Sequence, residues 1–136
     1  MAYWLVKEEP DKYPFSRFCK DGKTDWTGVR NYQARNHLRA MAVGDRVVYY
    51  HTGKERQAVG LAEVRRAAFP DPTAEKGDWS AVELVAGEAL ARPVPLAEIK
   101  ADSVLSGTAL VRQGRLSVVP LLKKEFDRLL KLAGQG

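Results

Sequence analysis

Hydrophobic residues along this chain are spaced mostly as they are in β-strands. Positions 3–7 are largely apolar or aromatic and Pro10 closes the run, so a first strand is expected there. Runs of the same kind predict further strands, in chain order, at residues 45–52, 58–65, 79–85 and 88–94. A turn at residues 86–87 separates the last two strands, and residues 69–78, with two prolines and a glycine, predict a long loop.

The strand predicted at residues 45–52 presents different side chains to its two faces. Successive side chains of a strand alternate, so Tyr50 points to the opposite side from Tyr49 and His51. Only one of Tyr50 and His51 can therefore face a given pocket. The pattern leaves open which of them does.

Helical spacing predicts two main helices. The first covers residues 31–41, where Tyr32 and Asn36 lie roughly opposite the apolar stripe and form a second organised face. Its apolar stripe consists of Ala34, Leu38 and Met41. The second helix is expected to begin at Pro120, because proline is favoured at the first helical position. Its core-facing stripe consists of Leu122, Phe126, Leu129, Leu130 and Ala133.

The remaining segments complete an α+β chain. Short helical turns are expected at residues 16–19, 95–100 and 102–106, and a short strand or extended segment at 109–112. These elements predict a single domain over residues 1–136. Its mixed, mostly antiparallel sheet has about five to six strands and flanking helices. A sheet this small is expected to curl into a barrel.

Charge and composition narrow the class of partner. The chain has 22 basic and 17 acidic residues, a net charge of +5, which suits an anionic partner such as nucleic acid. Cys19 is the single cysteine, so an intrachain disulfide is excluded and a reducing compartment is favoured. Neither a signal peptide nor a membrane-spanning run is present. A cytoplasmic monomer is expected, or a nuclear one in a eukaryote, with no membrane partner.

Residues 25–41 combine aromatic, amide and arginine side chains beyond what a core helix needs. Trp26 and Tyr32 offer flat faces for a base, and Asn31 and Asn36 offer donors and acceptors for its edge. The plainer alternatives are that Trp26 is a core residue and that Asn31 only caps the helix. Arg30, Arg35 and Arg39 supply charge for phosphate or form an ordinary solvated face.

Common catalytic and metal-binding motifs are missing from the sequence. Gly22-Lys23-Thr24 ends like a phosphate-binding loop, but Arg17 occupies the position of the required first glycine. There is no Gly-x-Ser-x-Gly motif and no zinc-ligand spacing, and the histidines are His37 and His51 alone. Catalytic residues, metal and cofactor are therefore not expected.

Several segments closely resemble the EVE domain family. The longest is Gly-Val-Arg-Asn-Tyr-Gln-Ala-Arg-Asn at residues 28–36, preceded by Trp26. Similar segments lie at residues 3–10, 44–51, 69–73 and 110–118, so the resemblance covers nearly the whole chain. Gly114 stands where the family is expected to have serine. The resemblance implies a PUA-like fold related to the YTH and ASCH families, whose members bind RNA or DNA bases, often modified ones.

With this resemblance, the chain is interpreted as a module that binds DNA or RNA and takes a flipped, modified base into an aromatic and polar pocket. The residues expected to bind the base are Lys7, Ser16, Trp26, Val29, Arg30, Asn31, Tyr32, Asn36, Tyr50 and His51. The residues expected to bind phosphate are Arg35, Arg39, Arg112, Gln113 and Arg115, although the last three can also be a solvated loop. Trp4 and Trp79 are expected in the core.

Two other functions remain open at this stage. One is a small ASCH-like hydrolase of a modified nucleoside, in which Lys7, Glu8 or Glu9 supplies acid–base chemistry. The other is a protein–protein adaptor, whose binding would ignore base modification.

Overall fold

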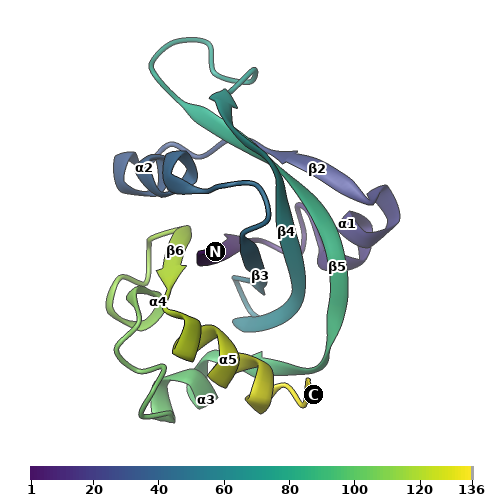
Figure 1. Cartoon of the computed structure of the whole chain (residues 1–136), viewed down its shortest axis with the longest axis vertical. Helices are drawn as coiled ribbons and strands as arrows, with labels where there is room; N and C mark the ends of the chain where they lie inside the picture. The colour runs from purple at the N-terminus through teal and green to yellow at the C-terminus, as the bar shows by residue number, and fades with distance from the viewer. Residues whose placement is uncertain (136) are drawn as a thin grey trace.

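A computed structural model describes residues 1–135 and contains, within them, six strands and five helices (Figure 1). In chain order the elements are β1 (Tyr3–Glu8), α1 (Phe15–Asp21), β2 (Lys23–Trp26), α2 (Tyr32–Ala40), β3 (Arg46–His51), β4 (Gln57–Pro70), β5 (Ser80–Pro95), α3 (Leu96–Ala101), α4 (Ala109–Arg112), β6 (Val118–Leu121) and α5 (Lys123–Leu132). The α+β class expected from the sequence is confirmed.

The strands form one mixed sheet in the order β2-β5-β4-β3-β1-β6. β1 runs parallel to β3, and the other neighbouring pairs are antiparallel. The sheet curls strongly, as the long β4 and β5 show in Figure 1, but it is not closed. The expected barrel is therefore wrong in this respect: the edge strands β2 and β6, with four residues each, pair on one side only among the described residues.

β5 is a single strand where the sequence predicts two strands and a turn. Ala86 and Gly87 lie in its middle, opposite β4. A Cβ at Gly87 would lie 2.9 Å from the carbonyl oxygen of Leu61, so the glycine permits a close approach of two backbones. Register shifts on both sides of Gly60 in β4 accompany the bend. The curvature of the sheet thus comes from bulges and small residues, without a break in β5.

The C-terminal third differs from the expectation at two points. Pro120 lies in β6 and does not begin the last helix. A proline without an N–H is tolerated there because β6 is an edge strand. Residues 109–112 form helix α4, not an extended segment. α5 begins at Lys123, and its expected core stripe is confirmed at Phe126, Leu129 and Ala133, which are buried, while Leu130 is partly buried. The prediction is wrong for Leu122, which precedes the helix and is 59% exposed.

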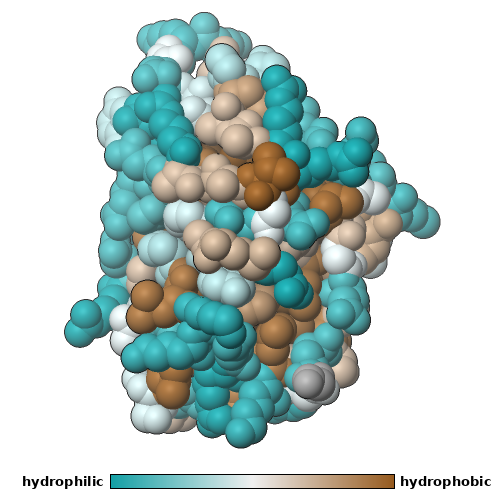
Figure 2. All heavy atoms as spheres, in the orientation of Figure 1, coloured by the Kyte–Doolittle hydropathy of each residue, from teal (hydrophilic) through white to brown (hydrophobic). Residues whose placement is uncertain are grey.

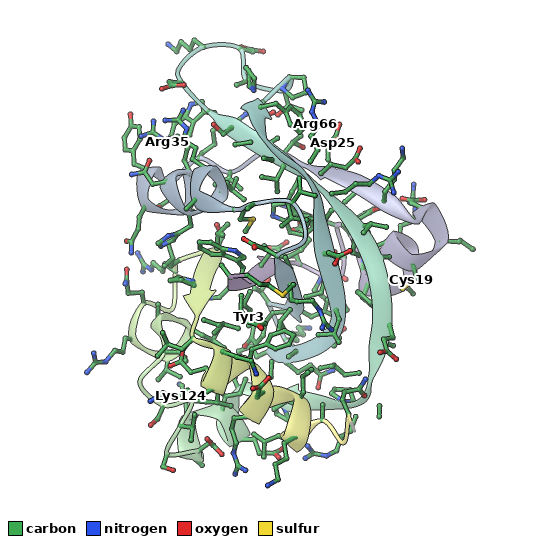
Figure 3. The ribbon with its side chains drawn as sticks, viewed as in Figure 1. Tyr3, Cys19, Asp25, Arg35, Arg66 and Lys124 are labelled. Carbon is green, nitrogen blue, oxygen red and sulfur yellow. The ribbon has the colours of Figure 1, made fainter. Side chains whose placement is uncertain are left out.

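The register of β1 against β3 assigns side chains to the two faces of the sheet. On one face Trp4 packs near α2, and on the other the Tyr3 ring lies 4.7 Å from an aromatic ring of α5 (Figure 3). Lys7 is on the Tyr3 face, and it pairs with Tyr50 across the parallel strands. Tyr50 therefore faces α3 and α4, whereas Tyr49 lies on the α1 and α2 side.

Candidate functional site

A pocket of about 210 Å³ lies where β1, β3 and the segment after α4 meet, and we call it the Lys7–Tyr50 pocket. The Lys7 ammonium donates a hydrogen bond to the carbonyl oxygen of Gly114 at 3.0 Å and lies 6.0 Å from the centre of the Tyr50 ring. Burial lowers the pKa of Lys7 and raises the pKa of the Tyr50 phenol. The lining residues are Lys7, Tyr50, Thr52, Gly53, Arg56, Leu96, Leu110 and Gly114.

The segment between α4 and β6 forms one rim of this pocket. Its Gly114 carbonyl accepts the hydrogen bond of the Lys7 ammonium, and the Lys7 amide donates to the carbonyl of Ser117 at 3.0 Å. The flanking Arg112, Gln113 and Arg115 are exposed, and their side chains have no hydrogen bond or ion pair within residues 1–135. Three residues expected to bind phosphate thus lie beside the pocket with free polar groups.

His51 and Ser16 lie away from the Lys7–Tyr50 pocket. His51 is buried on the opposite face from Tyr50, and both of its ring nitrogens are occupied. Nε2 accepts the amide N–H of Phe15 at 3.0 Å, and Nδ1 lies 2.9 Å from the Glu55 carboxylate. The histidine therefore anchors the start of α1. Ser16 is exposed on the same helix.

Trp26 and Val29 are part of the core. Trp26 has only 6% of its surface exposed, and its ring packs edge-on against Tyr49 at 5.5 Å between centres. Val29 is 7% exposed. A stacking role for Trp26 stays a prediction, and it requires the ring to be uncovered when a ligand binds.

A second cluster of predicted residues gathers around α2. Tyr32 is 67% exposed and stacks on Trp79, with 5.0 Å between ring centres and 17° between planes. The guanidinium groups of Arg30 and Arg35 lie 5.6 and 5.8 Å from the Trp79 ring. The assignment of Trp79 to the core is wrong, because the ring is only half-buried and covers the surface of α2. Trp4, in contrast, is buried as expected.

The polar residues of α2 are largely engaged by the loop between β4 and β5. Arg35 donates to the Asp78 carbonyl oxygen at 3.0 Å and to the side-chain oxygen of Asn36 at 3.2 Å (Figure 3). Arg39 forms an ion pair with the Asp78 carboxylate at 2.6 Å and donates to the Ser80 hydroxyl at 2.9 Å. A phosphate bound here would compete with these contacts.

The segment before α2 is fixed by two acceptors. The Asn31 side-chain oxygen accepts the Ala34 amide at 2.9 Å, so Asn31 caps the helix. The Asp71 carboxylate accepts the Gly28 amide at 2.8 Å and an N–H of Arg30 at 2.9 Å. Burial alone raises the pKa of Asp71, but hydrogen bonds from the Thr73 side chain, from Gly28 and from Arg30 outweigh it and hold the pKa at about 2.

Most of the pocket lining was missed from the sequence. Thr52, Gly53 and Arg56 belong to a polar stretch that indicated only a hairpin loop, and Leu96 and Leu110 are ordinary apolar residues there. No local signal marks them, because the pocket forms only when β3 and the segment after β5 fold together. In residues 1–135 there is no group of three or more His, Cys, Asp or Glu side chains arranged to hold a metal ion. No helix of this part is long and apolar enough to cross a bilayer.

Comparison with known proteins identifies the family. The model of the EVE domain matches residues 2–132. The human thymocyte nuclear protein 1 is 34% identical in an alignment 165 residues long, gaps included. The alignment covers 96% of this chain and 73% of that protein. The chain belongs to the EVE domain family. The resemblance noted in the sequence is thereby confirmed.

Solved EVE-like structures match the whole chain. Protein Atu2648 from Agrobacterium tumefaciens has a TM-score of 0.95 and 38% identity, covering 98% of this chain and 94% of that one. The human THYN1 protein, solved in complex with DNA containing 5-methylcytosine, has a TM-score of 0.91 and 31% identity, covering 100% and 99%. An ASCH protein from Zymomonas mobilis, at 15% identity and a TM-score of 0.59, shares the fold.

Proposed function

We propose that this EVE domain binds nucleic acid and holds one base, flipped out of its strand and preferably modified, in the Lys7–Tyr50 pocket. The observation that carries the proposal is the similarity to the human protein bound to methylcytosine DNA, combined with a small pocket that has unpartnered polar side chains at its rim. At about 210 Å³ the pocket lies below the range of about 300–1,000 Å³ common for drug-sized ligands, which suits a single base.

The pocket has the polar groups that reading a base edge needs. An ammonium group has three donors, and Lys7 uses one of them on the Gly114 carbonyl. The remaining donors can reach a carbonyl oxygen or ring nitrogen of the base. The Tyr50 hydroxyl, which has no hydrogen bond among the described residues, can donate or accept. Leu96 and Leu110 give an apolar wall that accommodates a methyl group without an unpaired polar atom.

Charged groups at the rim would hold the strand on either side of the base. Arg112, Gln113 and Arg115 are free to contact phosphate, and such contacts make binding weaker as the salt concentration rises. We further infer that the domain is PUA-like, acts as a monomer and accepts DNA or RNA. Trp26 remains a candidate stacking residue if binding opens the core beside it.

The test is a comparison of matched DNA and RNA oligonucleotides with and without methylated cytosine. We expect tighter binding of a methylated form. The variant Lys7→Met should bind it about tenfold more weakly, the effect of one lost hydrogen bond to a charged group. Lys23→Met removes the same charge from the exposed edge strand β2 and should bind like the parent. Equal binding of all oligonucleotides, or equal binding by the Lys7→Met variant, would refute the proposal.

The hydrolase alternative can be tested with the same preparation. Of the three candidate acid–base residues, Lys7 lines the pocket, whereas Glu8 uses a carboxylate oxygen to accept the Glu9 amide at 2.8 Å and neither Glu8 nor Glu9 lines it. Among the described residues, the pocket lining thus has no carboxylate to act with Lys7. We therefore expect chromatography to find no product after incubation with methylated nucleosides. A product formed in proportion to protein would favour the hydrolase instead.

A further inference from the structure

Three cationic side chains surround a groove next to the Lys7–Tyr50 pocket. The groove has a volume of about 320 Å³ and lies between the turn that joins β3 to β4 and the start of α3. Lys54 and Arg56 come from the turn and Lys100 from the helix, and we call this site the basic groove. The turn and the helix are separate segments of the chain, so the convergence of the three charges is a product of the fold.

The charges of the basic groove are not neutralised within the protein. Lys54, Arg56 and Lys100 form no ion pair within residues 1–135. The acidic residue in the lining is Glu55, and its carboxylate is taken by His51 Nδ1 at 2.9 Å and by the Gln57 amide at 3.2 Å. The hydrogen bond with His51 lowers the pKa of Glu55, so this carboxylate stays charged, and three cations with one carboxylate leave the groove a net charge of +2. The groove therefore offers three cations to an external anion.

The basic groove and the base pocket are continuous. Arg56 and Leu96 line both of them. A nucleotide whose base enters the Lys7–Tyr50 pocket leaves its sugar at the pocket mouth, with a phosphate on each side. One of these phosphates then lies beside Arg56, which lines both the pocket and the groove.

The backbone at Arg56 is fixed in an uncommon conformation. Its φ is +45°, and it is the one non-glycine residue with positive φ in the described chain, residues 1–135. The Arg56 carbonyl accepts the amide of Leu96 at 2.9 Å, which ties the turn to the start of α3. Backbone conformations of this uncommon kind are frequent at ligand-binding sites, where the surrounding structure stabilises them. Here the turn and the Leu96 contact fix the backbone of Arg56, from which its side chain reaches the lining of both the groove and the pocket.

We propose that the basic groove binds the phosphate of the nucleotide next to the base held in the Lys7–Tyr50 pocket. This inference rests on the proposed function and extends it to the backbone of the same strand. Arg56 contributes a planar fork that matches two phosphate oxygens, and Lys54 and Lys100 add point charges from either side. A contact with phosphate carries no base information, so the groove adds affinity for any sequence of the bound strand.

The experiment uses single-stranded DNA with one 5-methylcytosine and, in two further strands, one uncharged methylphosphonate on either side of that base. The test variant carries Lys54→Gln, Arg56→Gln and Lys100→Gln. The matched control carries Lys20→Gln, Lys23→Gln and Lys124→Gln, which remove three exposed charges on α1, β2 and α5 (Figure 3 labels Lys124). Thermal unfolding of each variant checks that the fold is kept.

We expect the parent and the control to lose about tenfold in affinity with one of the two methylphosphonate strands. The groove variant should bind the unmodified backbone about tenfold more weakly than the parent and respond to neither methylphosphonate. For the groove variant, the logarithm of the binding constant should fall less steeply with the logarithm of the salt concentration. The slope should be smaller by about 0.7, the value for one phosphate contact on a single strand.

The outcomes separate the two proposals. If the parent prefers methylated DNA and the groove variant binds with the same affinity and salt slope, the groove inference is wrong and the base pocket stands. If the parent has no preference but the groove variant still loses affinity and slope, the modified-base function is wrong and the phosphate contact stands. If the parent binds no strand at low salt, both are wrong.

Discussion

The buried Asp71 carboxylate should determine how firmly the segment before α2 is held. Its side chain is fully buried and receives hydrogen bonds from Gly28, Arg30 and Thr73. We expect Asp71→Asn, which keeps the shape and removes the charge, to lower the free energy of unfolding at pH 7.

The magnitude follows from the pKa. The Asp71 pKa falls from 3.8 to about 2 on folding, and this difference corresponds to about 2–3 kcal/mol of stability at pH 7. Because the folded pKa is the lower one, this contribution is complete above pH 3.8 and is lost as the pH falls toward 2. At pH 3, roughly half of it remains.

Urea denaturation of the parent and the variant at pH 7 and pH 3 measures the effect. The difference in the free energy of unfolding between the two proteins should be about 2–3 kcal/mol at pH 7 and should narrow by about 1 kcal/mol at pH 3. Asp78→Asn is the control, since that carboxylate is 81% exposed and its ion pair with Arg39 should contribute about 0.5 kcal/mol or less. A gap for Asp71→Asn that is independent of pH, or no larger than that of the control, would contradict the reasoning.

Three further predictions concern packing around the site, each read by urea denaturation and by DNA binding. His51→Ala leaves the Phe15 amide without its acceptor and should cost about 1–3 kcal/mol of stability, while the preference for methylated DNA is retained; loss of that preference would return His51 to the base site. Gly60→Ala places a Cβ 2.2 Å from the buried Phe15 ring and should cost about 1–3 kcal/mol by overpacking; unchanged stability would mean that the ring moves freely. Trp79→Ala removes the stack on Tyr32 and should cost about 0.5–1.5 kcal/mol, and a larger loss would indicate that the ring is a core residue after all.

The elements with strong local signals were predictable from the sequence. α2 falls within one residue of the expected range, because its apolar stripe and its Asn31 cap are both local features. The strand pair β3 and β4 was found for the same reason, although β4 continues beyond the expected end to Pro70. β2 was missed, because its four residues alternate in burial and carry charge, so pairing with β5 decides their structure.

The candidate site depends more heavily on tertiary structure. From the sequence, Lys7, Tyr50, Trp26 and Tyr32 were all assigned to one base site. The register of β1 against β3 instead places Lys7 and Tyr50 together on a face of the sheet that α2 does not cover. Trp79 lies at the end of the polar loop that joins β4 to β5. Its contact with Tyr32 of α2 therefore depends on the path that this loop takes between the two strands. The sequence could supply the residue types of a base pocket. The pairing of strands decides which of them meet.

On the face shown in Figure 2, hydrophilic residues predominate at the top and along the edges, and hydrophobic residues lie through the middle of the view.

The two unpaired edges of the sheet have a consequence for association between copies of this protein. An open edge with free backbone N–H and C=O groups can accept a strand from another molecule, which is a common route to aggregation. Here both edge strands are short, Pro120 removes one donor from β6, and β2 exposes the charged side chains of Lys23 and Asp25. Pro120, which the sequence pattern had placed at the start of the last helix, thus disfavours the pairing of this open edge with a strand of a neighbouring molecule.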